Sequence, residues 1–120
     1  MTITLNHTIV PARDHGAAAR FFAQIMGLTA APAHKFMQVR VNEQLALDFM
    51  AVEDPTGVHL AFDVDPATFD GVLARLRELG VPYGNDPRTP HNGRIDHLLA
   101  PRGLYFADAD HNLYEVMSPL

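Results

Sequence analysis

The sequence predicts an α+β fold assembled from two similar halves, and three observations support this prediction. A chain of 120 residues with 48% apolar and 19% charged residues is large enough to bury a core. Segments of alternating apolar residues, typical of strands, flank two segments whose apolar residues recur at helical spacing. This order occurs twice. We therefore expect one domain over residues 1–120, with modules of about residues 1–53 and 57–120.

The first half begins with residues 3–10, which alternate and are rich in β-branched side chains. They predict a strand that Pro11 ends. Asp14 is the expected N-cap of the helix that follows, and Gly27 is its expected C-cap. After a loop, two strands joined as a hairpin are expected over residues 36–41 and 45–51.

The second half repeats this order. Residues 58–64 predict a strand, and Asp65 is the expected N-cap of a helix with Pro66 in its first position. The apolar residues of this helix form one stripe, and Gly80 is expected to end it. The closing strands are expected over residues 104–107 and 113–117, with a polar turn between them.

The spacing of chemically active residues supports the repeat. The first-strand histidines, His7 and His59, lie 20 and 21 residues before the helix-ending glycines. The last strands carry Asp48 and Glu115. The second half contains about 14 additional residues before its carboxylate, within the turn-rich residues 84–102. We expect this segment to be a loop that borders a cleft between the halves.

Two imidazoles and one or two carboxylates on matching strands indicate a metal site. His7, His59 and Glu115 are the expected ligands, because imidazole nitrogen and carboxylate oxygen suit a divalent cation and leave positions open for substrate. Asp48 is expected to complete the site or to act as a general base. A carboxylate among apolar neighbours needs such a partner, since its desolvation is costly.

Each of these residues also has a structural interpretation. A single strand histidine is most often a structural residue bonded to the backbone, although its recurrence in both halves favours the ligand interpretation. Asp48 and Glu115 are also compatible with edge-strand charges that face water. Most remaining histidines are expected in solvent. His97, together with Arg94 or Arg102, is a candidate for binding substrate.

The composition argues against several classes of function. The net charge is −5 and the chain has no basic run, so nothing favours binding to nucleic acid or to an anionic membrane. There is no cysteine, which excludes disulfides, thiolate metal ligands and a cysteine nucleophile. The N-terminus has no secretory pattern, so the expected location is the cytoplasm.

Four short motifs are distributed along nearly the whole chain. They are Leu-Asn-His-Thr-Ile-Val at residues 5–10, Val-His-Leu-Ala-Phe-Asp-Val at 58–64, Arg-Gly-Leu-Tyr-Phe-Ala-Asp-Ala-Asp at 102–110 and Asn-Leu-Tyr-Glu-Val-Met at 112–117. Their order resembles the vicinal oxygen chelate superfamily. That group includes glyoxalase I, fosfomycin resistance proteins, extradiol dioxygenases, methylmalonyl-CoA epimerase and bleomycin resistance proteins.

The resemblance implies two βαβββ modules that form a paired, partly open, mixed β-barrel-like sheet with the helices outside. It carries the metal ligands onto His7, His59 and Glu115. Asp48 stands where glyoxalase-like members often have glutamate, which leaves its role as a ligand open. The implied cation is Fe(II), Mn(II), Zn or Ni, and Tyr105 is a candidate to donate a hydrogen bond to bound oxygen.

These features predict a metal-dependent enzyme that acts on a small substrate through vicinal oxygens, either glyoxalase/lyase-like or dioxygenase-like. Fosfomycin-type thiol transfer is less favoured, because Lys35 is the only lysine available for an anion pocket. The alternative is a metal-free protein that sequesters a small molecule such as an antibiotic, like the bleomycin resistance proteins. The resemblance also implies a homodimer, with each site formed within one chain or across two.

Overall fold

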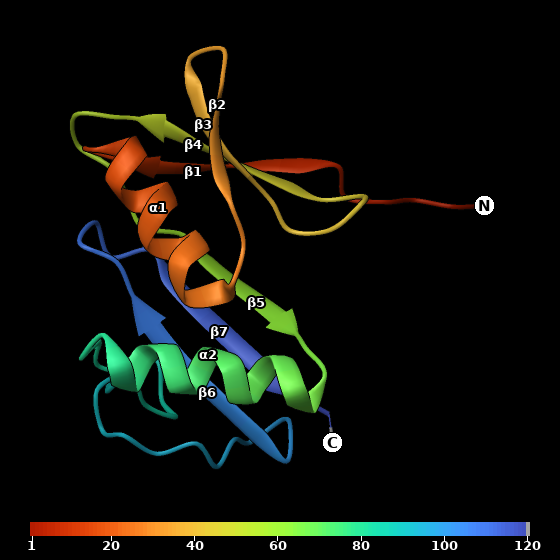
Figure 1. The fold of residues 1–120 in the computed structure, drawn as a ribbon, viewed down its shortest axis with the longest axis vertical. Helices are drawn as coiled ribbons and strands as arrows, with labels where there is room; N and C mark the ends of the chain where they lie inside the picture. The colour runs from red at the N-terminus through yellow and green to blue at the C-terminus, as the bar shows by residue number, and fades with distance from the viewer. Residues whose placement is uncertain (120) are drawn as a thin grey trace. The chain divides into compact units, whose positions relative to one another are not determined.

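A computed structural model describes residues 1–119 of the chain. The chain divides into two compact units, one spanning Met1–Gly57 and the other beginning at Val58. The first unit has the order strand, helix and three strands, and the described part of the second has the order strand, helix and two strands (Figure 1). The predicted α+β class and the repeated order of elements are confirmed.

The first unit contains a four-stranded mixed sheet in the order β1-β4-β3-β2. Its strands are β1 (His7–Ala12), β2 (Ala30–Ala33), β3 (Phe36–Arg40) and β4 (Ala46–Ala51). β1 and β4 run parallel, as expected for strands linked by a crossover, and the other neighbours run antiparallel. Helix α1 (His15–Met26) packs on one face of this sheet, where the Phe22 and Phe49 rings lie 6.0 Å apart.

Both predicted caps of α1 are confirmed. The Asp14 side chain accepts a hydrogen bond from the backbone N–H of Ala17 at 3.0 Å, so it satisfies one of the free donors of the first turn. Gly27 ends the helix with a φ of 73°, a left-handed conformation that glycine adopts without steric cost.

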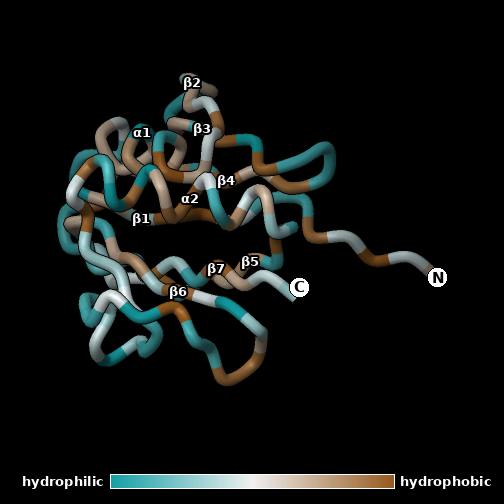
Figure 2. The backbone as a smooth tube through the Cα atoms, turned by 60° about the horizontal axis from the view of Figure 1, so that its bottom comes forward, coloured by the Kyte–Doolittle hydropathy of each residue, from teal (hydrophilic) through white to brown (hydrophobic). Residues whose placement is uncertain are grey.

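Two expectations for the first unit are wrong in detail. β1 begins at His7 rather than residue 3 and runs through Pro11, which is tolerated because β1 lies at the sheet edge. The loop expected between the first helix and the hairpin contains strand β2, with Pro32 at its third position. This strand also lies at an edge and lacks the alternation of a half-buried strand. Figure 2 shows the N-terminal segment before β1 as an extended chain whose hydropathy alternates.

The second unit contains a three-stranded sheet in the order β5-β7-β6 among the described residues. Its strands are β5 (His59–Asp63), β6 (Arg102–Ala107) and β7 (Leu113–Ser118), and its helix is α2 (Pro66–Glu78). The helix packs against β7. The fully buried core of this unit comprises Phe69, Val72, Leu76, Leu104, Phe106, Tyr114 and Val116.

The predicted ends of α2 are confirmed. Asp65 occupies the N-cap position, and its side chain bonds Thr68 rather than the backbone. The helix ends at Glu78 with Leu79 as C-cap, and the left-handed Gly80 follows directly and donates to the Arg77 carbonyl. One expectation for this unit is wrong. The implied third strand of this module is reduced, in the described chain, to an isolated bridge between Gly84 and Tyr105. Neither sheet closes on itself.

The segment between α2 and β6 is irregular, as predicted (Figure 1). Its backbone is nevertheless tied to β6: Gly84 and Tyr105 exchange two hydrogen bonds, and Gly103 donates to the Ile95 carbonyl at 2.8 Å. Side chains bond within the segment as well, since the Asn85 amide donates to the Asp96 carbonyl at 2.8 Å. No helix among residues 1–119 is long and apolar enough to cross a membrane.

Candidate functional site

The two units place a histidine and a carboxylate at the same positions of their sheets. In each unit the first-strand histidine pairs with the residue two positions before the last-strand carboxylate. The pairs are His7 with Ala46, two residues before Asp48, and His59 with Leu113, two residues before Glu115. Because side chains alternate along a strand, the histidine and the carboxylate share a face in each unit, opposite the face that the helix covers.

In the first unit the two side chains have separate partners. The Asp48 residue is 8% exposed, and its Oδ1 accepts a hydrogen bond from Nε2 of Gln38, its neighbour on β3, at 2.9 Å. His7 is exposed and bonds the side chain of Asn6 through Nδ1 at 2.8 Å. The carboxylate of this unit therefore has a neutral amide donor as its partner.

In the second unit two histidines contact one carboxylate. Glu115 is 5% exposed. Its Oε1 lies 2.9 Å from Nε2 of His59, and its Oε2 lies 2.7 Å from Nε2 of His97. The His59 side chain is 48% exposed, whereas that of His97 is 2% exposed. The half-exposed imidazole of His59 is therefore in hydrogen-bond contact with the buried carboxylate of Glu115.

Tyr105 of β6 lies directly opposite Glu115 of β7 and is a further neighbour of this carboxylate. Its ring lies 5.8 Å from the His59 ring and is stacked on the His97 ring at 5.7 Å. Burial, followed by a hydrogen bond to Glu115 and the negative charge of that residue, raises the pKa of Tyr105 to about 12. The phenol consequently stays protonated beyond its ordinary pKa of 10.0, and its single O–H is directed to Glu115.

The two arginines expected to bind substrate have other partners. Arg102 donates to Asp70 of α2 at 2.7 Å, and its guanidinium lies 4.5 Å from the centroid of the Phe69 ring. It therefore faces the helix and not the carboxylate of Glu115. Arg94 is exposed and forms a two-point ion pair with Asp96, at 3.1 and 3.0 Å.

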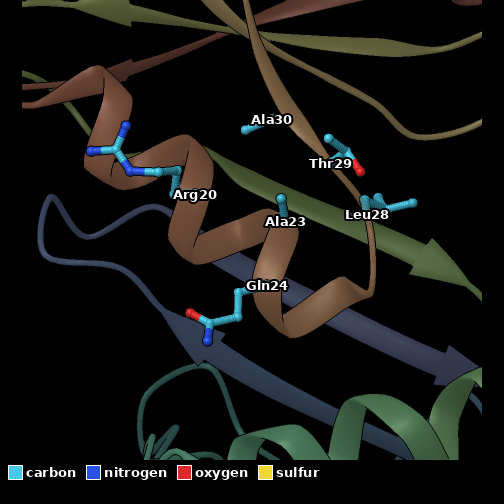
Figure 3. Close-up of a pocket in the computed structure, with 6 residues that line it drawn as sticks. All are labelled: Arg20, Ala23, Gln24, Leu28, Thr29 and Ala30. Carbon is cyan, nitrogen blue, oxygen red and sulfur yellow. The ribbon is translucent and has the colours of Figure 1, made fainter.

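Each unit has a small surface pocket. In the second unit, a pocket of about 170 Å³ lies between the irregular segment and Tyr105, with His97, Leu98 and Leu99 in its lining. The pocket of the first unit, about 330 Å³, lies beside α1 and the chain that follows it (Figure 3), and is lined by Arg20, Ala23, Gln24, Leu28, Thr29 and Ala30. Of these two pockets, the smaller one is lined by residues that surround Glu115.

The donors in the second unit suit a divalent cation in chemical type and in spacing. Two ligands about 2.1 Å from a cation and at right angles to each other lie about 3 Å apart. The separation between His59 Nε2 and Glu115 Oε1 is 2.9 Å, an ordinary hydrogen-bond distance that also agrees with this ligand spacing. No group of three or more histidine or acidic side chains arranged to hold a metal is found in residues 1–119. A complete site therefore needs a further donor.

His59, Glu115 and Tyr105, which the sequence analysis assigned to one site, lie close together in the second unit. Two relationships were not predicted. Gln38 was not predicted to partner Asp48, although its strand position opposite the carboxylate was available once the hairpin was aligned. His97 was predicted as a residue that binds substrate, but its contact with Glu115 was not predicted. No motif marks that contact, because an irregular segment has no periodicity from which to read its side-chain directions.

Comparison with known proteins places these features in context. A family model described as a glyoxalase-like domain matches residues 6–117. The solved structure of a protein described as Oxidase ChaP-H2 is 38% identical with a TM-score of 0.88, and the match covers 98% of this chain and 94% of that one. No curated protein matches the sequence.

More distant structures share the fold. The fosfomycin resistance protein FosX from Listeria monocytogenes is 21% identical with a TM-score of 0.70, covering 98% of this chain and 94% of that one. TnmS3, an antibiotic binding protein from Streptomyces sp. CB03234, is 23% identical with a TM-score of 0.71, covering 100% and 99%. One fold thus serves both a resistance protein and a binding protein, so function has to be argued from the site.

Proposed function

The chain belongs to the glyoxalase-like family of the vicinal oxygen chelate superfamily, and from that membership we propose that it is a divalent-metal-dependent enzyme. Its substrate is a small molecule that presents two adjacent oxygen atoms. The observation that supports this proposal is the contact between His59 and the buried Glu115, at 2.9 Å. A buried carboxylate that faces an imidazole at this spacing has the donor types that such cations prefer.

His59 and Glu115 are the proposed ligands within the second unit, and His7 is the proposed third. His7 occupies the strand position equivalent to that of His59. Its exposed side chain bonds Asn6 through Nδ1, so Nε2 is the proposed ligand atom. The proposal covers donation by His7 of the same chain and by His7 of a second copy in a homodimer. Asp48 already accepts a hydrogen bond from Gln38, so its role is the less supported part of the proposal.

The residues around Glu115 have distinct tasks in this proposal. When bound, a divalent cation supplies Lewis-acid polarisation of substrate oxygen. Tyr105 lines the pocket, stays protonated in the neutral range, and directs its one phenolic hydrogen bond to Glu115, so that it helps to hold this carboxylate. Leu98 and Leu99 are exposed beside that pocket and provide apolar surface for the carbon skeleton of a substrate.

Among the reaction classes, we favour an oxygen-using reaction over a lyase reaction. The match at 38% identity is described as an oxidase, and two histidines with one carboxylate are the set found in Fe(II) oxygenases. Fe(II) is accordingly the proposed cation, ahead of Mn(II), Zn and Ni. Sequestration of a small molecule without a metal is the competing function.

The test measures metal content and affinity. Protein purified without chelators is analysed for metals. Binding of Mn(II), used as a stable substitute for Fe(II), is then measured by calorimetry for the unmodified protein and for the variants His59→Ala, His7→Ala and His91→Ala. We expect His59→Ala and His7→Ala to abolish tight binding. His91 is an exposed histidine of the irregular segment, and its substitution is expected to change nothing. An unmodified protein that binds no divalent cation would falsify the enzyme proposal and favour sequestration.

A further inference from the structure

His97 reaches Glu115 from the irregular segment rather than from a strand. Its Nε2 lies 2.7 Å from Glu115 Oε2, the carboxylate oxygen that His59 does not contact. Its other ring nitrogen, Nδ1, accepts a hydrogen bond from the backbone N–H of Leu99 at 3.0 Å. Both nitrogens of His97 are therefore in use, one on each side of the ring.

These two contacts fix the tautomer of His97. An imidazole nitrogen that accepts a hydrogen bond carries no proton, so the proton of His97 resides on Nε2 and is donated to Glu115. A metal ligand needs a lone pair on the coordinating nitrogen. His97 cannot offer one through Nε2 while Leu99 occupies Nδ1, whereas none of the described residues forms a hydrogen bond with Nδ1 of His59, which leaves that ring able to exchange tautomers.

The fold also holds the His97 ring in place. The ring is stacked on Tyr105, and its side chain is 2% exposed. A Cβ added to Gly103 would lie 2.5 Å from its Cδ2 and 2.6 Å from its Cγ, so the ring occupies the space that a side chain on β6 would fill. A ring confined in this way has little freedom to turn.

We propose that His97 is a positioning residue that holds the Glu115 carboxylate with Oε1 directed to the cation and to His59. The inference rests on the proposed metal site and adds a residue to it. Hydrogen bonds from neighbouring groups to a ligating carboxylate orient it, and their loss typically costs about 10- to 100-fold in metal affinity. His97 therefore contributes to metal binding without being a ligand.

Two substitutions separate its role at Glu115 from its role in the loop. In His97→Gln the side-chain amide nitrogen can reach Glu115, so the donor is kept. In His97→Asn the side-chain oxygen can still accept from Leu99, but the shorter side chain does not reach the carboxylate. We expect Mn(II) affinity to fall about 10- to 100-fold in His97→Asn and to stay within about threefold of the unmodified protein in His97→Gln. His91→Ala is the matched control.

Nitrogen-15 NMR of the histidine rings supplies a readout that loop folding alone does not move. On addition of Zn(II), we expect Nε2 of His59 to acquire the shift of a metal-bound nitrogen, while His97 keeps its proton on Nε2. A metal-bound shift at Nε2 of His97 would overturn the positioning role and make it a ligand.

The two proposals fail in different ways. If the unmodified protein binds neither Mn(II) nor Zn(II), the enzyme proposal falls and takes the role of His97 with it. If it binds them and His97→Asn binds equally well while thermal unfolding shows it folded, only the positioning role is lost. An affinity in His97→Gln as low as in His97→Asn would likewise contradict the need for a donor to Glu115.

Discussion

The two units share one strand register but surround their equivalent carboxylates differently. Asp48 in the first unit faces Gln38, an amide that satisfies it with one neutral hydrogen bond. Glu115 in the second unit faces Tyr105 and contacts two histidines. The shared strand register therefore places a carboxylate at the equivalent position of both sheets. The side chains next to each carboxylate determine whether it has a structural role or is available for chemistry.

A second difference explains why, in the second unit, a histidine from outside the strands reaches the carboxylate. Two residues before Tyr105, strand β6 has Gly103, and the His97 ring occupies the space that its missing side chain leaves. Two residues before Gln38, strand β3 has Phe36. The corresponding position of the first unit is thus filled by its own side chain. Gly103 and the longer connection between α2 and β6 therefore account for the different surroundings of the two carboxylates.

The largest expected effect compares the two carboxylates directly. Glu115→Gln should weaken Mn(II) binding by at least about 100-fold, because it removes the charged ligand, whereas Asp48→Asn should change it by less than about threefold. Asn can still accept from Gln38, so folding is expected to be unaffected in the second variant. Calorimetric titration of both variants makes the comparison. Equal losses in the two would show that both acids serve the cation and that the units are functionally alike.

The next effect tests the packing of His97 on β6. Gly103→Ala should lower the free energy of unfolding by about 1–3 kcal/mol, because the added Cβ overlaps the ring of His97. The same substitution in a His97→Ala background should cost much less, since the overlapping ring is gone. Urea denaturation of the four proteins measures this coupling. An equal cost in both backgrounds would mean that the glycine is required for another reason.

The smallest effect concerns pH, and it also separates the units, because Gln38 has no titrating group where Tyr105 has one. The pKa of Tyr105 is raised from 10.0 to about 12 in the folded protein. Between these values the unfolded chain has lost the proton and the folded chain has not, so stability declines as pH rises from 10 to 12. Burial raises the pKa of Tyr114 as well, which adds to the same trend.

Tyr105→Phe is expected to reduce this decline without abolishing it. Urea denaturation at pH 9 and at pH 11.5, with the phenolate absorbance followed in parallel, gives the measurement. An identical decline in the variant would indicate that Tyr105 ionises alike in the folded and unfolded chains, contrary to its surroundings in the structure.

The sequence predicted those features that depend on periodicity and repetition. The caps Asp14 and Gly27, and the shared position of His59 and Glu115 on neighbouring strands, follow from spacing that local sequence determines. Strand β2 was missed because an edge strand of small residues with a proline has no alternation to detect.

The partners of the carboxylates were harder to predict, because they depend on tertiary packing. Gln38 is an ordinary polar residue until the hairpin places it opposite Asp48. The direction of His97 depends on a bond from Leu99 and on space at Gly103, and neither leaves a pattern in the sequence. Contacts made by an irregular segment can be read only from coordinates.

The irregular segment that carries His97 can open locally, whereas a strand within the sheet cannot open without breaking the sheet. Irregular segments can open locally at a lower free-energy cost than global unfolding. Such an opening would remove the hydrogen bond from His97 to Glu115 and leave the three-stranded sheet intact. The Leu99 amide, which is protected from exchange with solvent only while it bonds His97, is therefore a natural reporter of how often the protein visits that opened form.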